Sequence, residues 1–164
     1  FYVMANSVSE HCLYRLTPDG TVDSSYGSGG QVCPGTLAPG FTGVYAVAET
    51  TDGLILELAG GTAGGKIVKI DYSGNLVGVL ATLPFSPKFF KVSSSGQIYY
   101  GGDYGNPNYV VRIGRLNADG TPDATFHAPY GYLDLHNTNY QQTVSLDISW
   151  IGTKKNVHAT SFLC

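Results

Sequence analysis

A strand-like run that ends in an Asp-Gly turn recurs along this chain, and this recurrence constrains the fold more than any other feature. Its two clearest copies are residues 14–26 (Tyr-Arg-Leu-Thr-Pro-Asp-Gly-Thr-Val-Asp-Ser-Ser-Tyr) and residues 114–126 (Gly-Arg-Leu-Asn-Ala-Asp-Gly-Thr-Pro-Asp-Ala-Thr-Phe). A degenerate copy occupies residues 68–76. Self-similarity at this spacing is typical of stacked supersecondary units.

Each unit of the repeat contains short stretches in which apolar and polar residues tend to alternate, as expected of half-buried strands. In the best-defined unit the stretches are residues 44–48, 54–58, 66–70 and 76–80. Tight turns such as Asp52-Gly53 separate them. The pattern predicts three strands in an incomplete first unit, four in each of the next two units, and two in an incomplete last unit. No stretch keeps a helical period.

We therefore expect an all-β, β-propeller-like fold with about three four-stranded blades, partial at both ends. The chain is expected to be one repeat region, residues 1–164, with units at roughly 1–42, 43–87, 88–142 and a partial unit at 143–164. Three blades are fewer than the four to eight that usually close a propeller. We expect these units either to belong to a larger propeller or to be completed by other chains.

The composition argues against several classes of function. Only 13% of the residues are charged, about half the usual fraction, and the formal net charge is −3. The nine Lys and Arg residues are scattered, so we expect no nucleic-acid partner. No apolar run approaches the roughly 20 residues of a membrane helix, so no membrane span is predicted. The 22 glycines and 12 tyrosines suit short strands and tight turns, and favour an extracellular or assembly protein.

The three cysteines leave two interpretations open. Cys12, Cys33 and Cys164 are an odd number, so one thiol is left over however they pair. In one interpretation all three are free thiols that are buried in the core as small apolar side chains. A Cys12–Cys33 disulfide between neighbouring strands is the alternative, and it would imply an oxidising compartment.

The Asp-Gly segments carry a family resemblance. Residues 116–126 resemble the delta-sixty repeat family, and residues 16–30 match the same pattern, including its trailing Gly-x-Gly-Gly. Residues 52–61 and 95–102 resemble the other half of that repeat. The middle copy departs from the pattern, because it has Ser73-Gly74 and no second Asp. The resemblance implies a β-propeller-like fold found in bacterial secreted or surface proteins and in phage virions, and it implies no catalytic residues.

The same turns supply the one metal hypothesis. Oxygen-bearing side chains at this spacing around a glycine turn are candidate calcium ligands, although the full EF-hand loop is absent. The candidates are Asn117, Asp119 and Asp123 in one copy, with Asp19 and Asp23 in the other. The competing interpretation is that Asp23 and Asp123 accept hydrogen bonds from nearby backbone amides. No other cofactor is predicted.

Evidence for catalysis is weak. The chain has no Gly-x-Ser-x-Gly motif and no phosphate-binding loop at the start of a helix. Asp134 and His136 would share a face of an extended segment, where an acid–base or metal pair is conceivable. An ordinary polar loop is the simpler interpretation, so we expect no enzyme activity.

Aromatic residues point instead to a contact surface. The long polar loop at residues 129–142 is predicted to carry it, since tyrosines make low-entropy anchors for proteins and stack on sugars. The candidate contact residues are Tyr104, Tyr130, Tyr132, Tyr140 and Trp150. Of the adjacent pair Tyr99 and Tyr100, only one is expected to point into the core, since the two face opposite sides of a strand.

Three functions follow from these observations, in order of preference. The first is a structural or interaction module of an extracellular, cell-surface or virion assembly, such as a phage tail or fibre, with protein partners. The second is a glycan- or receptor-binding adhesin on the same scaffold. The third is a hydrolase or lyase built on a propeller.

Overall fold

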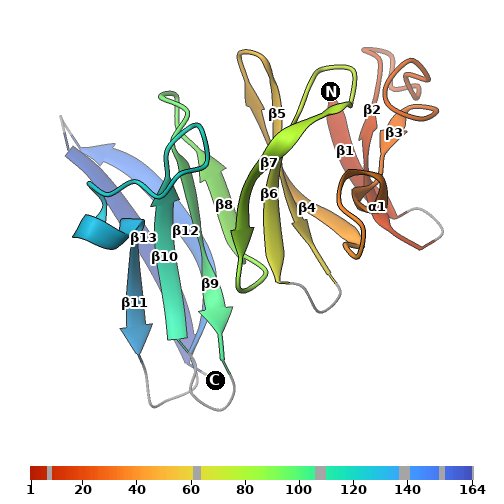
Figure 1. Cartoon of the computed structure of the whole chain (residues 1–164). Coiled ribbons are helices and arrows are strands. Elements are labelled where there is room, and N and C mark those ends of the chain that lie inside the picture. Colours follow the sequence, from red (N-terminus) through yellow and green to blue (C-terminus); the bar gives the residue numbers. More distant parts are fainter. Residues whose placement is uncertain (7–8, 61–63, 106–109, 137–140, 152–153, 164) are drawn as a thin grey trace. The chain divides into compact units, whose positions relative to one another are not determined.

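The computed structural model describes residues 1–6, 9–60, 64–105, 110–136, 141–151 and 154–163. It divides the chain into two compact units, Phe1–Ser86 and Pro87–Cys164. Figure 1 shows that both units are built almost entirely of strands. In the described residues, no helix has the length and apolar character that crossing a membrane requires.

The first unit contains a seven-stranded sheet with the order β1-β2-β4-β5-β6-β7, in which β3 also pairs with β2. Its strands are β1 (Tyr2–Asn6), β2 (His11–Arg15), β3 (Gln31–Val32), β4 (Gly43–Thr50), β5 (Gly53–Ala59), β6 (Gly65–Ile70) and β7 (Leu76–Leu83). All neighbours are antiparallel except β2 and β4, which meet in parallel through the single pair His11 and Gly43. One short helical turn, α1 (Pro34–Leu37), follows β3.

Strand β5 is the centre of this sheet, and all seven of its residues are buried. Leu54, Leu56 and Leu58 lie on the face that packs into the main apolar cluster, together with residues of the neighbouring strands and of the α1 region. Ile55 and Glu57 lie on the other face, which is also buried. A strand covered on both faces reads as an almost continuous apolar run, as Leu-Ile-Leu-Glu-Leu does here.

The second unit contains a four-stranded antiparallel sheet with the order β11-β10-β9-β8, and a separate hairpin of β12 and β13. The bounds are β8 (Phe89–Val92), β9 (Ile98–Tyr104), β10 (Val110–Leu116), β11 (Tyr132–His136), β12 (Gln141–Ile151) and β13 (Lys154–Leu163). A short turn, η1 (His127–Gly131), leads into β11.

The all-β class expected from the sequence is confirmed. The long loop predicted at residues 129–142 is wrong in part, because residues 132–136 form β11, which pairs with β10. The assignment of these strands to blades at residues 1–42, 43–87, 88–142 and 143–164 stays a prediction. The expectation that only one of Tyr99 and Tyr100 lies inside is wrong, because both are buried. Tyr100 faces Gly114 across β9 and β10, and the missing side chain at that glycine leaves room for the tyrosine ring.

A disulfide joins Cys12 to Cys33. Of the two interpretations of these cysteines, the structure therefore has the disulfide and not two free buried thiols. Cys12 lies on β2, and Cys33 follows directly after β3, which pairs with β2. The bridge ties the β3–α1 segment to the sheet. Cys164 lies outside the described residues.

Candidate functional site: a tyrosine–arginine cluster on β9, β10 and β11

The first predicted site, the pair of Asp-Gly turns, forms the same hydrogen-bonded loop in both copies. In the second copy the Asn117 amide N–H donates to the Thr121 carbonyl, and the Gly120 N–H donates to the Asn117 carbonyl. Thr17, Gly20 and Thr21 repeat this pattern in the first copy. Gly20 and Gly120 have φ values of +86° and +87°, a backbone conformation that glycine adopts readily.

The first aspartate of each turn accepts hydrogen bonds within its own loop. An Asp119 oxygen accepts from the Thr121 amide at 2.9 Å and from its hydroxyl at 2.7 Å. The Asp19 oxygen accepts from the hydroxyls of Thr17 and Thr21. These bonds lower the pKa of Asp19 and of Asp119 below the usual value, so both carboxylates stay charged.

The second aspartate of each turn binds an arginine eight residues earlier. Asp123 Oδ1 accepts from the amide and hydroxyl of Thr125, and its Oδ2 lies 2.7 Å from Nε of Arg115. The Thr125 bonds and Arg115 together lower the pKa of Asp123 to about 2. Arg115 also donates to the Thr125 hydroxyl and lies over the Phe126 ring.

The first copy repeats this arrangement with Arg15, Asp23, Ser25 and Tyr26. We call each set an Arg–Asp clasp. In the degenerate middle copy, Lys69 stands at the arginine position and pairs with Asp52 instead.

The clasps bear on the calcium hypothesis. The oxygens of Asp23 and Asp123 are engaged by amides, hydroxyls and arginines, which is the turn-stabilising role weighed above. In the described part of the chain, the only cluster of three His, Cys, Asp or Glu ligand atoms lies elsewhere, at Glu10, Cys12 and Cys33. Calcium binding at Asn117, Asp119, Asp123, Asp19 and Asp23 stays a prediction.

The acid–base candidate Asp134 forms an ion pair. On β11 it faces Arg112 of β10. Nε of Arg112 donates to Oδ1 of Asp134 at 2.7 Å, and Nη2 donates to Oδ2, also at 2.7 Å. This two-pronged geometry matches a planar guanidinium to a carboxylate. The side chain of His136 lies outside the described set. Both oxygens of Asp134 are therefore bound by the guanidinium of Arg112.

Three of the predicted contact residues gather around this pair. The Arg112 guanidinium lies 3.6 Å from the ring centroid of Tyr132 and 5.2 Å from that of Tyr104. The Tyr104 hydroxyl donates to Asp134 and accepts from Arg112. The Tyr130 ring lies 5.9 Å from that of Tyr132, and Tyr130 is 59% exposed. We call these five residues the tyrosine cluster: Tyr104, Arg112, Tyr130, Tyr132 and Asp134. Tyr140 lies outside the described residues, and so does the side chain of Trp150.

Sequence reasoning did not single out Glu57, which is 3% exposed in the middle of β5. Its register partners are Ala46 on β4 and Ile67 on β6, and its Oε1 has no hydrogen-bond partner among the residues that the structure describes. Burial raises the pKa of Glu57 to about 7. The signal in the sequence was a single acid inside the run Leu-Ile-Leu-Glu-Leu.

Comparison with known proteins agrees with this architecture. The family described as "Domain of unknown function (DUF5122) beta-propeller" matches residues 1–26 and 93–126, the segments that contain the two Asp-Gly turns. Neither curated proteins nor solved structures gave a significant match to the chain. The matched segments and the antiparallel sheets together identify the chain as an all-β, β-propeller-like repeat protein.

Proposed function

We propose that this chain is a non-enzymatic interaction module of an extracellular, cell-surface or virion assembly, and that it docks a protein partner at the tyrosine cluster. The observation that carries the proposal is that Tyr104 and Tyr132 lie against Arg112, while the exposed Tyr130 packs on Tyr132. Figure 1 shows the strands β9, β10 and β11, which carry Tyr104, Arg112 and Tyr132. Tyrosine and arginine are the residue types most enriched at the energetic centres of protein interfaces.

The cluster suits docking because most of it is already ordered. Tyr104 and Tyr132 are fixed by Arg112, which is itself fixed by Asp134. An interface loses less side-chain entropy when its anchors are held in place before binding. Tyr130 extends this ordered base into solvent, where its ring offers a large contact area.

The neighbouring sheet edge supports the same assignment. Among the described strands β11 pairs only with β10, in five consecutive pairs without a bulge. By contrast the edge strand β7 has two register shifts against β6. Bulges are one way in which proteins protect an edge from pairing with another chain. The regular edge of β11, with Leu135 47% exposed, is suited to receive an extended segment of a partner.

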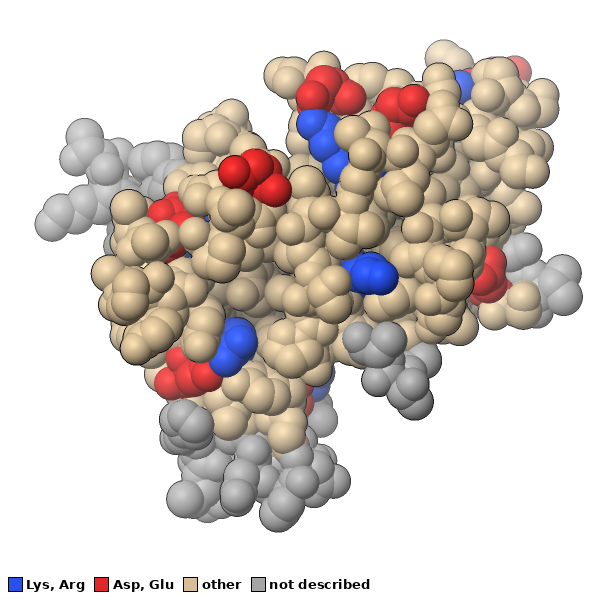
Figure 2. Space-filling view, in the orientation of Figure 1, with Lys and Arg blue, Asp and Glu red and all other residues tan. Residues whose placement is uncertain are grey.

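Two further observations support an extracellular setting. The Cys12–Cys33 disulfide is typical of oxidising compartments. Charged side chains are few, and Figure 2 shows them as small isolated groups on an otherwise uncharged face. The ion pair of Asp134 with Arg112 supports a non-enzymatic role, because Asp134 was the best acid–base candidate of the sequence.

The test is retention of the full-length protein in its native assembly, measured as the fraction that copurifies with the cell envelope or virion. Tyr130→Ser should weaken retention at least tenfold, because truncating an interface anchor typically costs more than about 1.4 kcal/mol. Leu135→Ser should weaken it as well, because a strand added to β11 contacts both faces of that strand.

The matched control is Tyr45→Ser. Tyr45 is 51% exposed and lies on β4 of the first unit, whereas the tyrosine cluster belongs to the second unit. Unchanged retention of Tyr130→Ser, or an equal loss in Tyr45→Ser, would refute docking at this site. Circular dichroism of each variant establishes that the sheet content is intact.

A further inference from the structure

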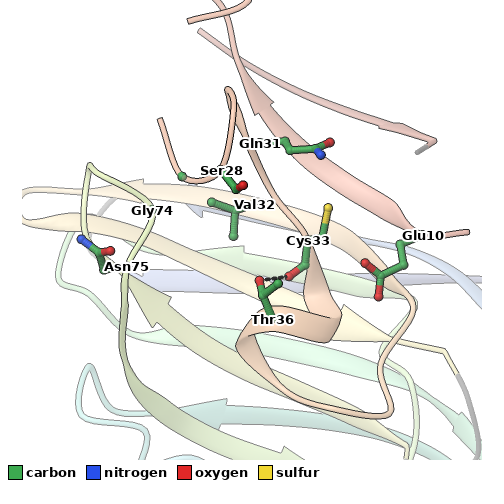
Figure 3. A pocket seen from close by; sticks show the side chains of 9 residues that line it. Glu10, Ser28, Gln31, Val32, Cys33, Thr36, Gly74 and Asn75 are labelled. Carbon is green, nitrogen blue, oxygen red and sulfur yellow. Dashed lines mark hydrogen bonds between the residues drawn. The ribbon is translucent and has the colours of Figure 1, made fainter. Parts of the chain in front are cut away.

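A pocket of about 380 Å³ lies in the first unit, beside the disulfide. Its volume falls within the range of roughly 300–1,000 Å³ usual for ligand sites. Three segments that are distant in sequence build it: Glu10 before β2, the loop and turn around β3, and the Gly74-Asn75 turn. Figure 3 shows Glu10 and Cys33 on one side, Asn75 on the other, and Val32 between them.

The walls of the pocket are fixed by covalent and hydrogen bonds. The disulfide holds Cys33 against β2, and the Gly35 amide donates to Oε1 of Glu10 at 3.2 Å. The Gly27 amide donates to the Ser73 carbonyl at 2.9 Å, which joins the β3 loop to the opposite turn. A pocket that is ordered before its ligand arrives loses little entropy on binding.

Glycine is required where these two walls meet. Gly74 has a φ of +92°, and a Cβ there would lie 2.6 Å from a methyl carbon of Val32 and 3.1 Å from Cα of Gly27. A larger residue would therefore push the turn away from the loop and open the wall. The close approach also holds Val32, which is 4% exposed, as an apolar floor.

Polar groups without a partner line the pocket. Within the part of the chain that the structure describes, no group hydrogen-bonds the hydroxyl of Ser28, the side-chain amide of Gln31 or the Oε2 oxygen of Glu10. Asn75 uses its amide nitrogen to bind Asp71, which leaves its side-chain oxygen as an acceptor. The pocket thus offers acceptors and donors at several points around an apolar floor.

The charge of the lining restricts the ligand. Among the described residues of the lining, Glu10 is the only charged one, and none is Lys, Arg or His. An anionic ligand would find no cation to pair with. A metal ion would find one carboxylate, because the sulfurs of Cys12 and Cys33 are bonded to each other and are not thiolates. Neutral hydroxyl groups match the lining, since each can both donate and accept.

We propose that this pocket binds a single neutral sugar ring, with its hydroxyls on Glu10, Gln31 and Ser28 and its apolar face on Val32. The sugar is either a free monosaccharide or the terminal residue of a glycan. This role goes beyond the proposed protein docking and depends on residues of the first unit alone.

The experiment is a titration of the isotopically labelled full chain, followed by NMR. The probes are D-glucose, D-galactose, D-mannose and N-acetyl-D-glucosamine, each as the free sugar and as its methyl glycoside, raised to tens of millimolar. At least one should bind with a Kd in the millimolar range, as the size of one ring implies. The shifts should be confined to the amide of Glu10 and to the amides of residues 27–33, 35–36 and 73–75. Binding of the free sugar alone identifies a monosaccharide, and binding of both forms identifies a glycan end.

Variants locate the site. Glu10→Gln and Ser28→Ala should each weaken binding at least fivefold, and Glu10→Gln retains the oxygen that Gly35 binds. The matched controls are Glu49→Gln and Ser24→Ala, which lie outside the lining and should bind as the unmodified chain does. The proposal would be overturned if no sugar binds, if the shifts are centred elsewhere, or if the control variants lose binding equally. It would also be overturned if methylammonium, titrated as a cationic comparison ligand, binds more tightly than every sugar.

Discussion

Nε of Arg115 lies 2.7 Å from Oδ2 of Asp123, and the same atoms of Arg15 and Asp23 meet at 2.9 Å a hundred residues earlier in the chain. In each copy the arginine ends or nearly ends a strand, and the aspartate closes the turn that follows. The repeat seen in the sequence is therefore a repeat of one ion pair and its turn.

Breaking the clasp should cost more in the second copy than in the first. The side chains of Arg115 and Asp123 are 15% and 7% exposed, against 23% and 27% for Arg15 and Asp23. A less exposed pair is less screened by water, and Asp123 also accepts from Gln97. We expect Asp123→Asn to destabilise its turn by about 2–3 kcal/mol and Asp23→Asn to destabilise its turn by a smaller amount.

Hydrogen exchange of each variant measures these effects, through the amide of Thr125 in Asp123→Asn and the amide of Ser25 in Asp23→Asn. Because the folded-state pKa of Asp123 is depressed to about 2, its contribution is present above pH 4 and is lost as the pH falls toward 2. Equal costs in the two copies would contradict the role given to burial.

Glu57 should make the first unit less stable as the pH rises. Its folded pKa of about 7 lies above the reference value of 4.5, so the folded state binds more protons between these values. Stability is then full below about pH 4.5 and falls until about pH 7, by roughly 3 kcal/mol.

Urea unfolding between pH 4 and pH 8 measures this dependence. Glu57→Gln removes the titrating group and should flatten the curve, whereas Glu49→Gln, at an exposed position of β4, should leave it unchanged. A pH dependence that survives in Glu57→Gln would show that another group causes it.

Reduction of the disulfide should loosen the β3–α1 segment. The bond closes a loop of 21 residues, for which chain entropy gives about 3 kcal/mol of stabilisation. The double variant Cys12→Ser with Cys33→Ser should therefore speed hydrogen exchange at Val32 and Leu13, which pair across β3 and β2. Exchange at Ile67 on β6 serves as the internal reference. Unchanged protection at Val32 would mean that packing alone holds the segment.

Local signals in the sequence were sufficient for the turns and for most strands. Asp-Gly pairs and alternation identify hairpins, and the loops at Gly20 and Gly120 form as this chemistry predicts. The arginine partner of Asp123 was also visible in the sequence, since Arg15 and Arg115 stand at the same place in both copies.

Features that depend on strand pairing could not be predicted from local sequence. Tyr104, Arg112 and Tyr132 meet only because β10 lies between β9 and β11. Glu57 is buried because β5 is covered on both faces, which alternation alone does not reveal. The sugar pocket needs Glu10, β3 and the Gly74 turn in one place, and it depends on the pairing of β2 with β3.

The central claim, docking of a protein at the tyrosine cluster, is tested most directly by site-specific photo-crosslinking. A benzophenone amino acid replaces Tyr130 in the full-length protein, and Tyr45 in a matched control, before irradiation of the native assembly. The account predicts one discrete crosslinked protein from position 130 and none from position 45. No product from position 130, or the same products from both positions, would contradict it.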